Sequence, residues 1–202
     1  MPTFDIENSY NLDFVAGIDE AGRGPLCGSV FSACALILDR NSIPAKIDDS
    51  KKISEKNREA IFEEILNLEK EHKILFGIGQ GSVEEIEQLN IRNATKLSMA
   101  RAYNNLVEKY NQKIDLVLVD GNFVPEISTR AEFVIKGDQK SFSIATASII
   151  AKVSRDRLLR QMDLEFPQYN WIKNKGYGTA EHMEAIRKYG LCKYHRKSFI
   201  HL

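Results

Sequence analysis

The sequence reads FVAGIDEAGRGP from Phe14 to Pro25, where an apolar run gives way to two adjacent acids and a glycine-flanked arginine. The apolar residues at its start are good strand formers, and the glycines and proline that follow predict a turn. Asp19 and Glu20 stand where the strand meets this turn, and Arg23 lies between two glycines. Carboxylates beside such an arginine indicate a site where bound metal ions contact a phosphate group.

The adjacency of the two acids constrains the geometry of this segment. Neighbouring residues in a regular strand point to opposite faces of the sheet, so Asp19 and Glu20 could not both address one site from within a strand. We therefore expect the strand to end at these residues. Gly22 and Gly24 supply the backbone freedom that the turn needs.

Strand and helix signals alternate along the rest of the chain. Strands are expected over residues 14–18, 30–38, 73–78, 115–120 and 131–135. Helices are expected from Ser54, from Ser82 as a short helix followed by a longer one, over 143–159 and over 179–188. This order predicts an α/β fold with a mixed sheet and helices on its faces, rather than a purely parallel sheet.

Composition excludes several classes of protein. The 202 residues, 43% of them hydrophobic, suffice for one well-packed domain. No uncharged run approaches the roughly 20 apolar residues of a membrane span, and the acidic N-terminus does not resemble a targeting peptide. The three cysteines are too scattered for a disulfide framework or a zinc site, and Cys34 is expected in the core. We expect a cytoplasmic protein that makes no membrane contact.

Charge is unevenly distributed although the formal net charge is zero. From Ala151 onward the chain has 11 Lys and Arg against 5 Asp and Glu, which leaves the first 150 residues net acidic. Such a split can reflect two ordinary solvated faces. It also fits an acidic half that holds metal and a basic half that meets a polyanion.

Further acids fall near the ends of predicted strands. Asp120 ends the run DLVLVD, and Asp138 follows the last predicted strand within KGD. If the strands ending at Asp19 and Asp120 are neighbours, these carboxylates converge with Glu20 at one edge of the sheet. Clustered acids repel one another and raise one another's pKa, so cations normally neutralise them. Ligands made only of oxygen favour Mg²⁺ or Mn²⁺ over zinc.

Several longer motifs resemble those of one known family. In order along about residues 15–199, GIDEAGRGPLCG, DDSKK, LVDGN, KGDQKSFSIATASIIAKVSRDR and KGYGT resemble the motifs of the bacterial type 2 ribonuclease H (ribonuclease HII) family. The resemblance implies a ribonuclease H-like fold, a mixed five-stranded sheet flanked by helices with a small helical C-terminal segment. It implies one catalytic domain over residues 1–202, in which about 166–202 contact substrate.

The resemblance also implies an activity. The expected enzyme is a metal-dependent endonuclease that hydrolyses the RNA strand of RNA/DNA hybrids. It would also incise duplex DNA 5′ to a single embedded ribonucleotide, leaving 5′-phosphate and 3′-hydroxyl ends. The expected partners are these two nucleic acids, and the chain is expected to act as a monomer.

By the same resemblance, the catalytic and metal-binding residues are Asp19, Glu20, Asp120 and Asp138. They would hold two Mg²⁺ or Mn²⁺ ions about 4 Å apart across the scissile phosphate. Asp138 is the candidate for a mobile ligand, so Asp138→Asn should lose turnover while hybrid binding persists. Asp156 competes as a fourth acid, but its spacing from Lys152 indicates an ion pair on a helix surface.

Substrate recognition must distinguish RNA from DNA, and the 2′-hydroxyl makes that distinction locally. The resemblance implies that Gly22-Arg23-Gly24 reads the sugar together with Tyr177, which packs at the ribonucleotide-to-deoxyribonucleotide junction. His182 either faces solvent or supports the Tyr177 loop. The candidate phosphate contacts are the pair Lys51 and Lys52 and, as a second candidate, the basic cluster Lys193, His195, Arg196 and Lys197.

Two other classes of function share some of these features. Integrases, transposases and Holliday-junction nucleases use the same carboxylate architecture on DNA that lacks a ribonucleotide. A requirement for an embedded ribonucleotide separates them from the expected enzyme. A non-enzymatic hybrid-binding module would show no metal-dependent cleavage at all.

Overall fold

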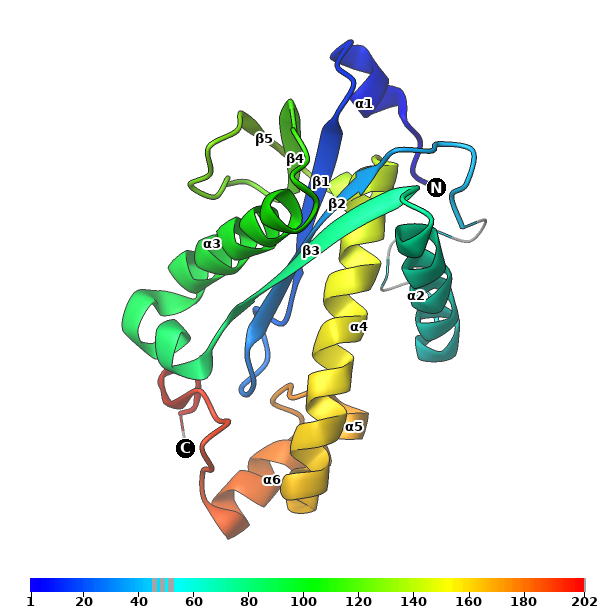
Figure 1. Cartoon of the computed structure of the whole chain (residues 1–202). Coiled ribbons are helices and arrows are strands. Elements are labelled where there is room, and N and C mark those ends of the chain that lie inside the picture. Colours follow the sequence, from blue (N-terminus) through cyan, green and yellow to red (C-terminus); the bar gives the residue numbers. More distant parts are fainter. Residues whose placement is uncertain (45–46, 48–49, 51–52, 202) are drawn as a thin grey trace.

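A mixed five-stranded sheet lies at the centre of the molecule (Figure 1). The computed structural model describes residues 1–44, 47, 50 and 53–201. In the order β3-β2-β1-β4-β5, the first three strands are antiparallel neighbours, and β4 and β5 run parallel to β1. The strands are β1 Val15–Ala21, β2 Val30–Ile37, β3 Ile74–Gly81, β4 Leu116–Asp120 and β5 Ala131–Val134. The prediction of a mixed sheet is confirmed.

The first strand is longer than its sequence indicates. β1 continues through both acids to Ala21, which pairs with Phe31 of β2. The prediction that the strand ends at Asp19 and Glu20 is wrong, because antiparallel pairing with β2 extends the strand past the local turn signal. Asp19 and Glu20 therefore alternate across the sheet as adjacent strand residues do.

Helices begin where their capping residues predict. Ser54 accepts a hydrogen bond from the backbone of Asn57, and Ser82 forms a capping box with Glu85. The helix after Ser82 is broken at Asn90, whose φ of 65° is not helical, so the expected short and long helices are confirmed. The α-helices are α1 Asp5–Ser9, α2 Glu55–Lys70, α3 Val83–Tyr110, α4 Phe142–Glu165, α5 Trp171–Asn174 and α6 Ala180–Tyr189. The short 3₁₀ turns are η1 Gly137–Gln139, η2 Pro167–Tyr169 and η3 Lys197–Phe199.

Helices cover both faces of the sheet (Figure 1). α2 and α4 pack against one face, and α3 packs against the other. α4 lies very close to β1, because a Cβ added at Gly17 would be 2.3 Å from the backbone nitrogen of Ile144. The small residues at the start of α4 allow this approach, which fixes the helix beside the end of β1.

The C-terminal segment packs beneath the second half of α4. Trp171, Tyr169 and Leu159 share a buried cluster with Cys27, from the segment between β1 and β2. Backbone hydrogen bonds of 2.8 Å join Gly28 to Tyr194 and Arg196 to Leu26. The end of the chain thus lies directly beside the glycine-rich turn. Across the described ranges, we find no helix both long and apolar enough to cross a membrane.

Candidate active site

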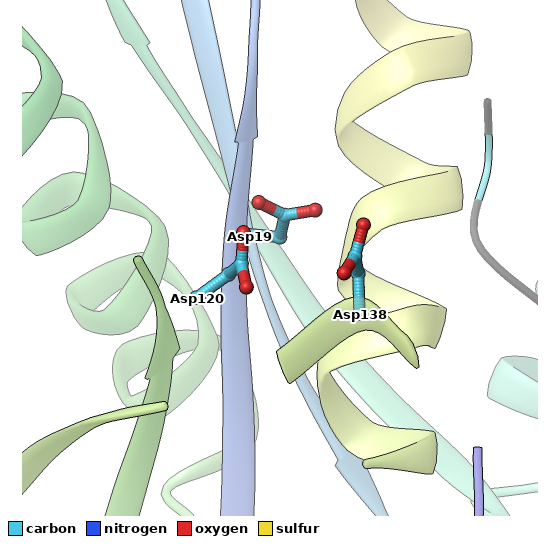
Figure 2. A group of neighbouring side chains, drawn as sticks. All are labelled: Asp19, Asp120 and Asp138. Atoms are coloured by element: carbon cyan, nitrogen blue, oxygen red, sulfur yellow. The ribbon is translucent and has the colours of Figure 1, made fainter. Parts of the chain in front are cut away.

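Three aspartates from separate elements meet at the edge of the sheet (Figure 2). Asp19 lies in β1, Asp120 ends β4, and Asp138 lies in η1. One carboxylate oxygen from each lies within 4.8 Å of the other two. Asp19 and Asp138 are buried, whereas Asp120 is partly exposed. The sequence prediction that these three acids converge is confirmed.

The register of two parallel strands brings the first pair together. Ile18 pairs with Val119, so Asp19 and Asp120 occupy the next position on neighbouring strands. Asp120 in turn holds the turn that carries Asp138, because its Oδ1 accepts a 2.6 Å hydrogen bond from the backbone N–H of Gly137. A Cβ at Gly137 would approach Ile144 to 2.5 Å, so glycine permits this close turn. The mobility expected of Asp138 stays a prediction.

The electrostatics of the cluster suit a cation. Burial raises the pKa of the Asp19 carboxyl well above its usual range, and the carboxylates of Glu20 and Asp120 raise it further. A hydrogen bond from Ser148 opposes this rise in pKa. Three ionised carboxylates at this spacing repel one another, and a hard divalent ion removes that cost. The donor set consists only of carboxylate oxygens and therefore fits Mg²⁺ or Mn²⁺.

Glu20 stands apart from the three aspartates. It pairs with Ser32 of β2, whose hydroxyl lies 2.6 Å from that of Ser98 in α3. Glu20 therefore points toward the α3 side of the sheet, while Asp19 points toward α4. Its carboxylate forms a 3.2 Å ion pair with Arg23. Glu20 still borders the same cleft as Asp19, so it stays a candidate fourth ligand.

A cleft of about 500 Å³ wraps around the end of β1. Asp19 and Glu20 line it together with the Gly22-Arg23-Gly24 turn and Tyr177. A Cβ at Gly24 would lie 3.4 Å from the Tyr177 ring, which is 53% exposed. The structure thus brings Asp19 and Glu20 into one cleft with the expected sugar-reading residues, although 153 positions separate Gly24 from Tyr177 in sequence.

Arg196 does not reach the substrate surface. Its side chain is fully buried, and its guanidinium donates hydrogen bonds to the backbone carbonyls of Gly22, Arg23, Pro25 and Gly28 at 2.6–3.0 Å. The prediction that Arg196 contacts phosphate is wrong, because every one of these bonds holds the arginine beneath the turn. Arg196 therefore stabilises the glycine-rich turn from the interior of the protein.

Asp156 is also buried, contrary to its interpretation as a surface ion pair. Its Oδ1 lies 2.6 Å from Lys152 Nζ, as the spacing on α4 predicts. Its Oδ2 lies 3.6 Å from Arg58 of α2, which also donates to the backbone carbonyl of Ser50. α2 packs over this part of α4 and removes Asp156 from solvent. The network joins the wall of the cleft to the segment around Ser50.

We expect Asp156→Asn to lower the free energy of unfolding by about 3 kcal/mol, because it leaves the buried Arg58 and the half-buried Lys152 without their counter-ion. Urea unfolding measures this loss. Glu181→Gln is the matched control, since Glu181 pairs with Lys173 at an exposed site, and its unfolding midpoint should stay unchanged. Equal midpoints for both variants would show that the buried network adds nothing to stability.

Most basic side chains from Ala151 onward already have acidic or backbone partners. Arg157 and Arg160 pair with Glu59, Lys175 pairs with Glu55, and Lys193 pairs with Glu165. Their charge is therefore partly neutralised within the protein. Lys51 and Lys52 lie outside the described residues, and their phosphate contacts stay predictions.

Sequence reasoning missed three residues of α4 that line the cleft: Ser148, Lys152 and Arg155. Their spacing of four and three residues places them on one helix face, a signal that could have identified them. Arg155 is buried and donates to the carbonyls of Cys27 and Lys175. It thereby links the segment after the glycine-rich turn to the Tyr177 loop.

The strand order, with acids near the C-terminal end of β1 and at the end of β4, defines a nuclease of the ribonuclease H-like class. The sequence matches the ribonuclease HII family model over residues 16–202. Ribonuclease HII of Wolbachia pipientis subsp. Culex pipiens (strain wPip) is 50% identical, with 98% of this chain and 95% of the relative covered. Ribonuclease HII of Caldanaerobacter subterraneus subsp. tengcongensis is 46% identical, with 94% and 75% covered.

Solved structures show the same fold. Ribonuclease HII of Archaeoglobus fulgidus, solved in a complex with PCNA, superposes with a TM-score of 0.74 at 22% identity, covering 94% of this chain and 96% of that one. Bst-RNase HIII in complex with Mn²⁺ gives a TM-score of 0.69 at 19% identity, covering 88% and 63%. This chain belongs to the ribonuclease HII family and is a ribonuclease H endonuclease. Enzymes of this class depend on divalent metal ions and act on RNA/DNA hybrids.

Proposed function

We propose that this enzyme cleaves the RNA strand of hybrids and also incises duplex DNA 5′ to a single embedded ribonucleotide. The products are a 3′-hydroxyl and a 5′-phosphate, and the tasks are ribonucleotide excision and removal of RNA primers. One observation carries the proposal: Asp19 of the acidic cluster, Glu20, the Gly22-Arg23-Gly24 turn and Tyr177 border a single cleft. A phosphate at the cluster therefore has its sugar within reach of the groups suited to reading a 2′-hydroxyl.

The proposed metal ligands are Asp19, Asp120 and Asp138, with Glu20 as the fourth carboxylate. Two Mg²⁺ or Mn²⁺ ions, when bound with substrate, supply Lewis-acid stabilisation of the attacking and leaving oxygens. The protein holds the carboxylates in place beforehand. The backbone N–H of Glu20 donates to Asp19 Oδ1 at 2.7 Å, and the N–H of Gly137 orients Asp120. Little reorganisation is then needed when the cations bind.

The proposed recognition surface is the glycine-rich turn with Tyr177. Without side chains, Gly22 and Gly24 let backbone groups approach a sugar closely. Arg23 has 42% of its side chain exposed and is the candidate for phosphate contact from this turn. Lys51 and Lys52 are further candidates. Residues from about 166 onward serve this surface mainly by supporting it, as Arg196 does.

Cleavage of a duplex with one central ribonucleotide tests the proposal. We expect incision at its 5′ side with Mg²⁺ or Mn²⁺, and none with a chelator. A uniform RNA/DNA hybrid should be cut as well, while an all-DNA duplex of the same sequence should stay intact. Cutting of the all-DNA duplex would contradict the proposal and favour an integrase-type DNA nuclease. Cleavage of the hybrid alone would limit the enzyme to RNA/DNA hybrids.

A further inference from the structure

A chain of buried hydrogen bonds lies behind the exposed ring of Tyr177. The Tyr177 carbonyl lies 2.9 Å from Nδ1 of His182, and His182 Nε2 lies 3.3 Å from His195 Nε2. His195 Nδ1 in turn contacts both the backbone N–H and the sulfur of Cys192, at 3.0 and 3.2 Å. We call His182, His195 and Cys192 the histidine relay. Both imidazoles are buried, with exposed fractions of 0% and 2%.

The partners of the rings determine where their protons lie. A carbonyl only accepts, so His182 carries its proton on Nδ1 and donates to Tyr177. Its Nε2 is then an acceptor, consistent with the 3.0 Å hydrogen bond from the indole N–H of Trp171. His195 Nε2, facing the same acceptor, must be the protonated nitrogen. Its Nδ1 is left to accept from Cys192, so each bond has one donor and one acceptor.

This assignment requires both rings to be neutral. Burial and the neighbouring His182 lower the pKa of His195 to about 4, and burial also lowers the pKa of His182. The rings face an aromatic cage, with Tyr169 4.7 Å and Trp171 5.6 Å from His195 between ring centroids. The titratable groups hydrogen-bonded to the two rings are those of the relay itself. At neutral pH, the donor and the acceptor of each hydrogen bond in the relay therefore stay the same.

The same carbonyl also anchors the start of α6. The N–H of Thr179 donates to it at 2.8 Å, and Thr179 caps the helix through the backbone N–H of His182. Two donors thus fix the peptide that follows the Tyr177 Cα. Because Tyr177 lies in a short turn between α5 and α6, fixing this peptide restrains the backbone from which the ring projects.

We propose that His182 and His195 are positioning residues that orient Tyr177 at the ribonucleotide-to-deoxyribonucleotide junction, and so contribute to preference for a single embedded ribonucleotide. The proposal rests on the proposed function, in which Tyr177 packs on the sugar. Neither histidine lines the cleft, so neither is placed to touch the substrate there, and the proposed effect passes through the tyrosine. The relay also gives the end of the chain a role in specificity that requires no contact with nucleic acid.

Nitrogen-15 NMR of the histidine side chains in the wild-type enzyme at pH 7 tests the geometry directly. We expect His182 protonated only at Nδ1 and His195 only at Nε2. Either ring as an imidazolium, or His182 protonated at Nε2, would overturn the proposal. The measurement needs no variant, so it holds even where a substitution impairs folding.

Kinetics on two substrates test the consequence. The amide nitrogen of asparagine can replace Nδ1 as the donor to Tyr177, whereas glutamine places its amide near Nε2. We expect His182→Gln to lower kcat/KM about tenfold on the single-ribonucleotide duplex, the loss of one hydrogen bond worth about 1.4 kcal/mol. On a uniform hybrid kcat/KM should fall less than about threefold, since that substrate has no junction. His182→Asn should keep the wild-type ratio of kcat/KM on the single-ribonucleotide duplex to kcat/KM on the uniform hybrid.

Tyr177→Ala separates failure of this inference from failure of the proposed function. If Tyr177→Ala changes the substrate ratio but His182→Gln does not, the relay has no positioning role and the proposed function stands. If Tyr177→Ala leaves the ratio unchanged, the junction role of the tyrosine is wrong, and the inference falls with it. Equal loss on both substrates in His182→Gln indicates a purely structural role and also overturns the inference.

Discussion

Asp120→Asn is expected to lower kcat about a thousandfold, equivalent to about 4 kcal/mol of transition-state stabilisation. Asparagine retains the shape of the side chain and can still accept the hydrogen bond from Gly137. It removes one of the three charges that would bind cations. Asp13→Asn, at an exposed position ahead of β1, is the control and should retain full activity. Single-turnover cleavage of a hybrid at saturating enzyme measures the effect.

The same variant should not be less stable in the absence of metal. Asp120 raises the pKa of Asp19, so the ionised form of Asp19 is disfavoured in the folded state. A raised folded-state pKa contributes stability below the unfolded pKa and loses it as pH rises through the folded value. At pH 7 with chelator, Asp120→Asn should therefore melt at the same temperature as the wild type or higher. Mn²⁺ should raise the Tm of the wild type more than that of the variant.

A clear drop in Tm with chelator would assign Asp120 a structural role and remove the reason for its loss of activity. Equal stabilisation of both proteins by Mn²⁺ would show that the cation binds elsewhere. If the three aspartates bind metal, Asp120→Asn should lose turnover and still fold.

Gly22→Ala is expected to lower incision about a hundredfold, the loss that a displacement of about 1 Å in a positioning element can cause. Gly22 has a φ of +99°, and an added Cβ would lie 2.1 Å from Nε of Arg155 and 2.4 Å from its Cδ. Arg155 cannot move away easily, because it is buried and bonded to the carbonyls of Cys27 and Lys175. The glycine-rich turn must shift instead. Cleavage rates on the single-ribonucleotide duplex measure the result.

Gly190→Ala is the matched control for this substitution. Gly190 has a φ of +80°, and an added Cβ would meet nothing within 4 Å. Both variants carry the backbone strain of a positive φ, about 1–2 kcal/mol, but only Gly22→Ala also creates a clash. Gly190→Ala should therefore lose stability and keep its activity. Similar activity in the two variants would mean that the position of the turn does not limit cleavage.

Much of the fold was predictable because its signals are local. Serines at positions 54 and 82 cap helices through bonds to residues three positions away, so the sequence alone marks where these helices begin. Apolar runs that end on Asp19 and Asp120 indicate strands with acids near one edge. The extent of β1 was not predictable, since pairing with Phe31 and Ser32 carries the strand past the acids.

The candidate site likewise has one part that the sequence predicts and another that it does not. Its carboxylates and its glycine-rich turn are visible in sequence, because they combine unusual residue types at short spacing. The roles of buried cations are not visible. Arg196 follows His195 in a basic cluster that resembles a phosphate contact, yet its guanidinium donates to backbone carbonyls of Gly22 and Gly28. His182 carries no sequence signal for its contact with Tyr177 beyond proximity.

FVAGIDEAGRGP already contains the oxygen donors that suit hard divalent cations and the glycines that let a backbone approach a sugar, since both properties belong to the residues themselves. Tertiary packing selected which carboxylates meet, turning Asp19 toward α4 and Glu20 toward α3. It also determined that Arg155 and Arg196 support the turn from within, rather than meet phosphate. A guanidinium binds whichever acceptors surround it, and those acceptors come from segments far apart in the chain.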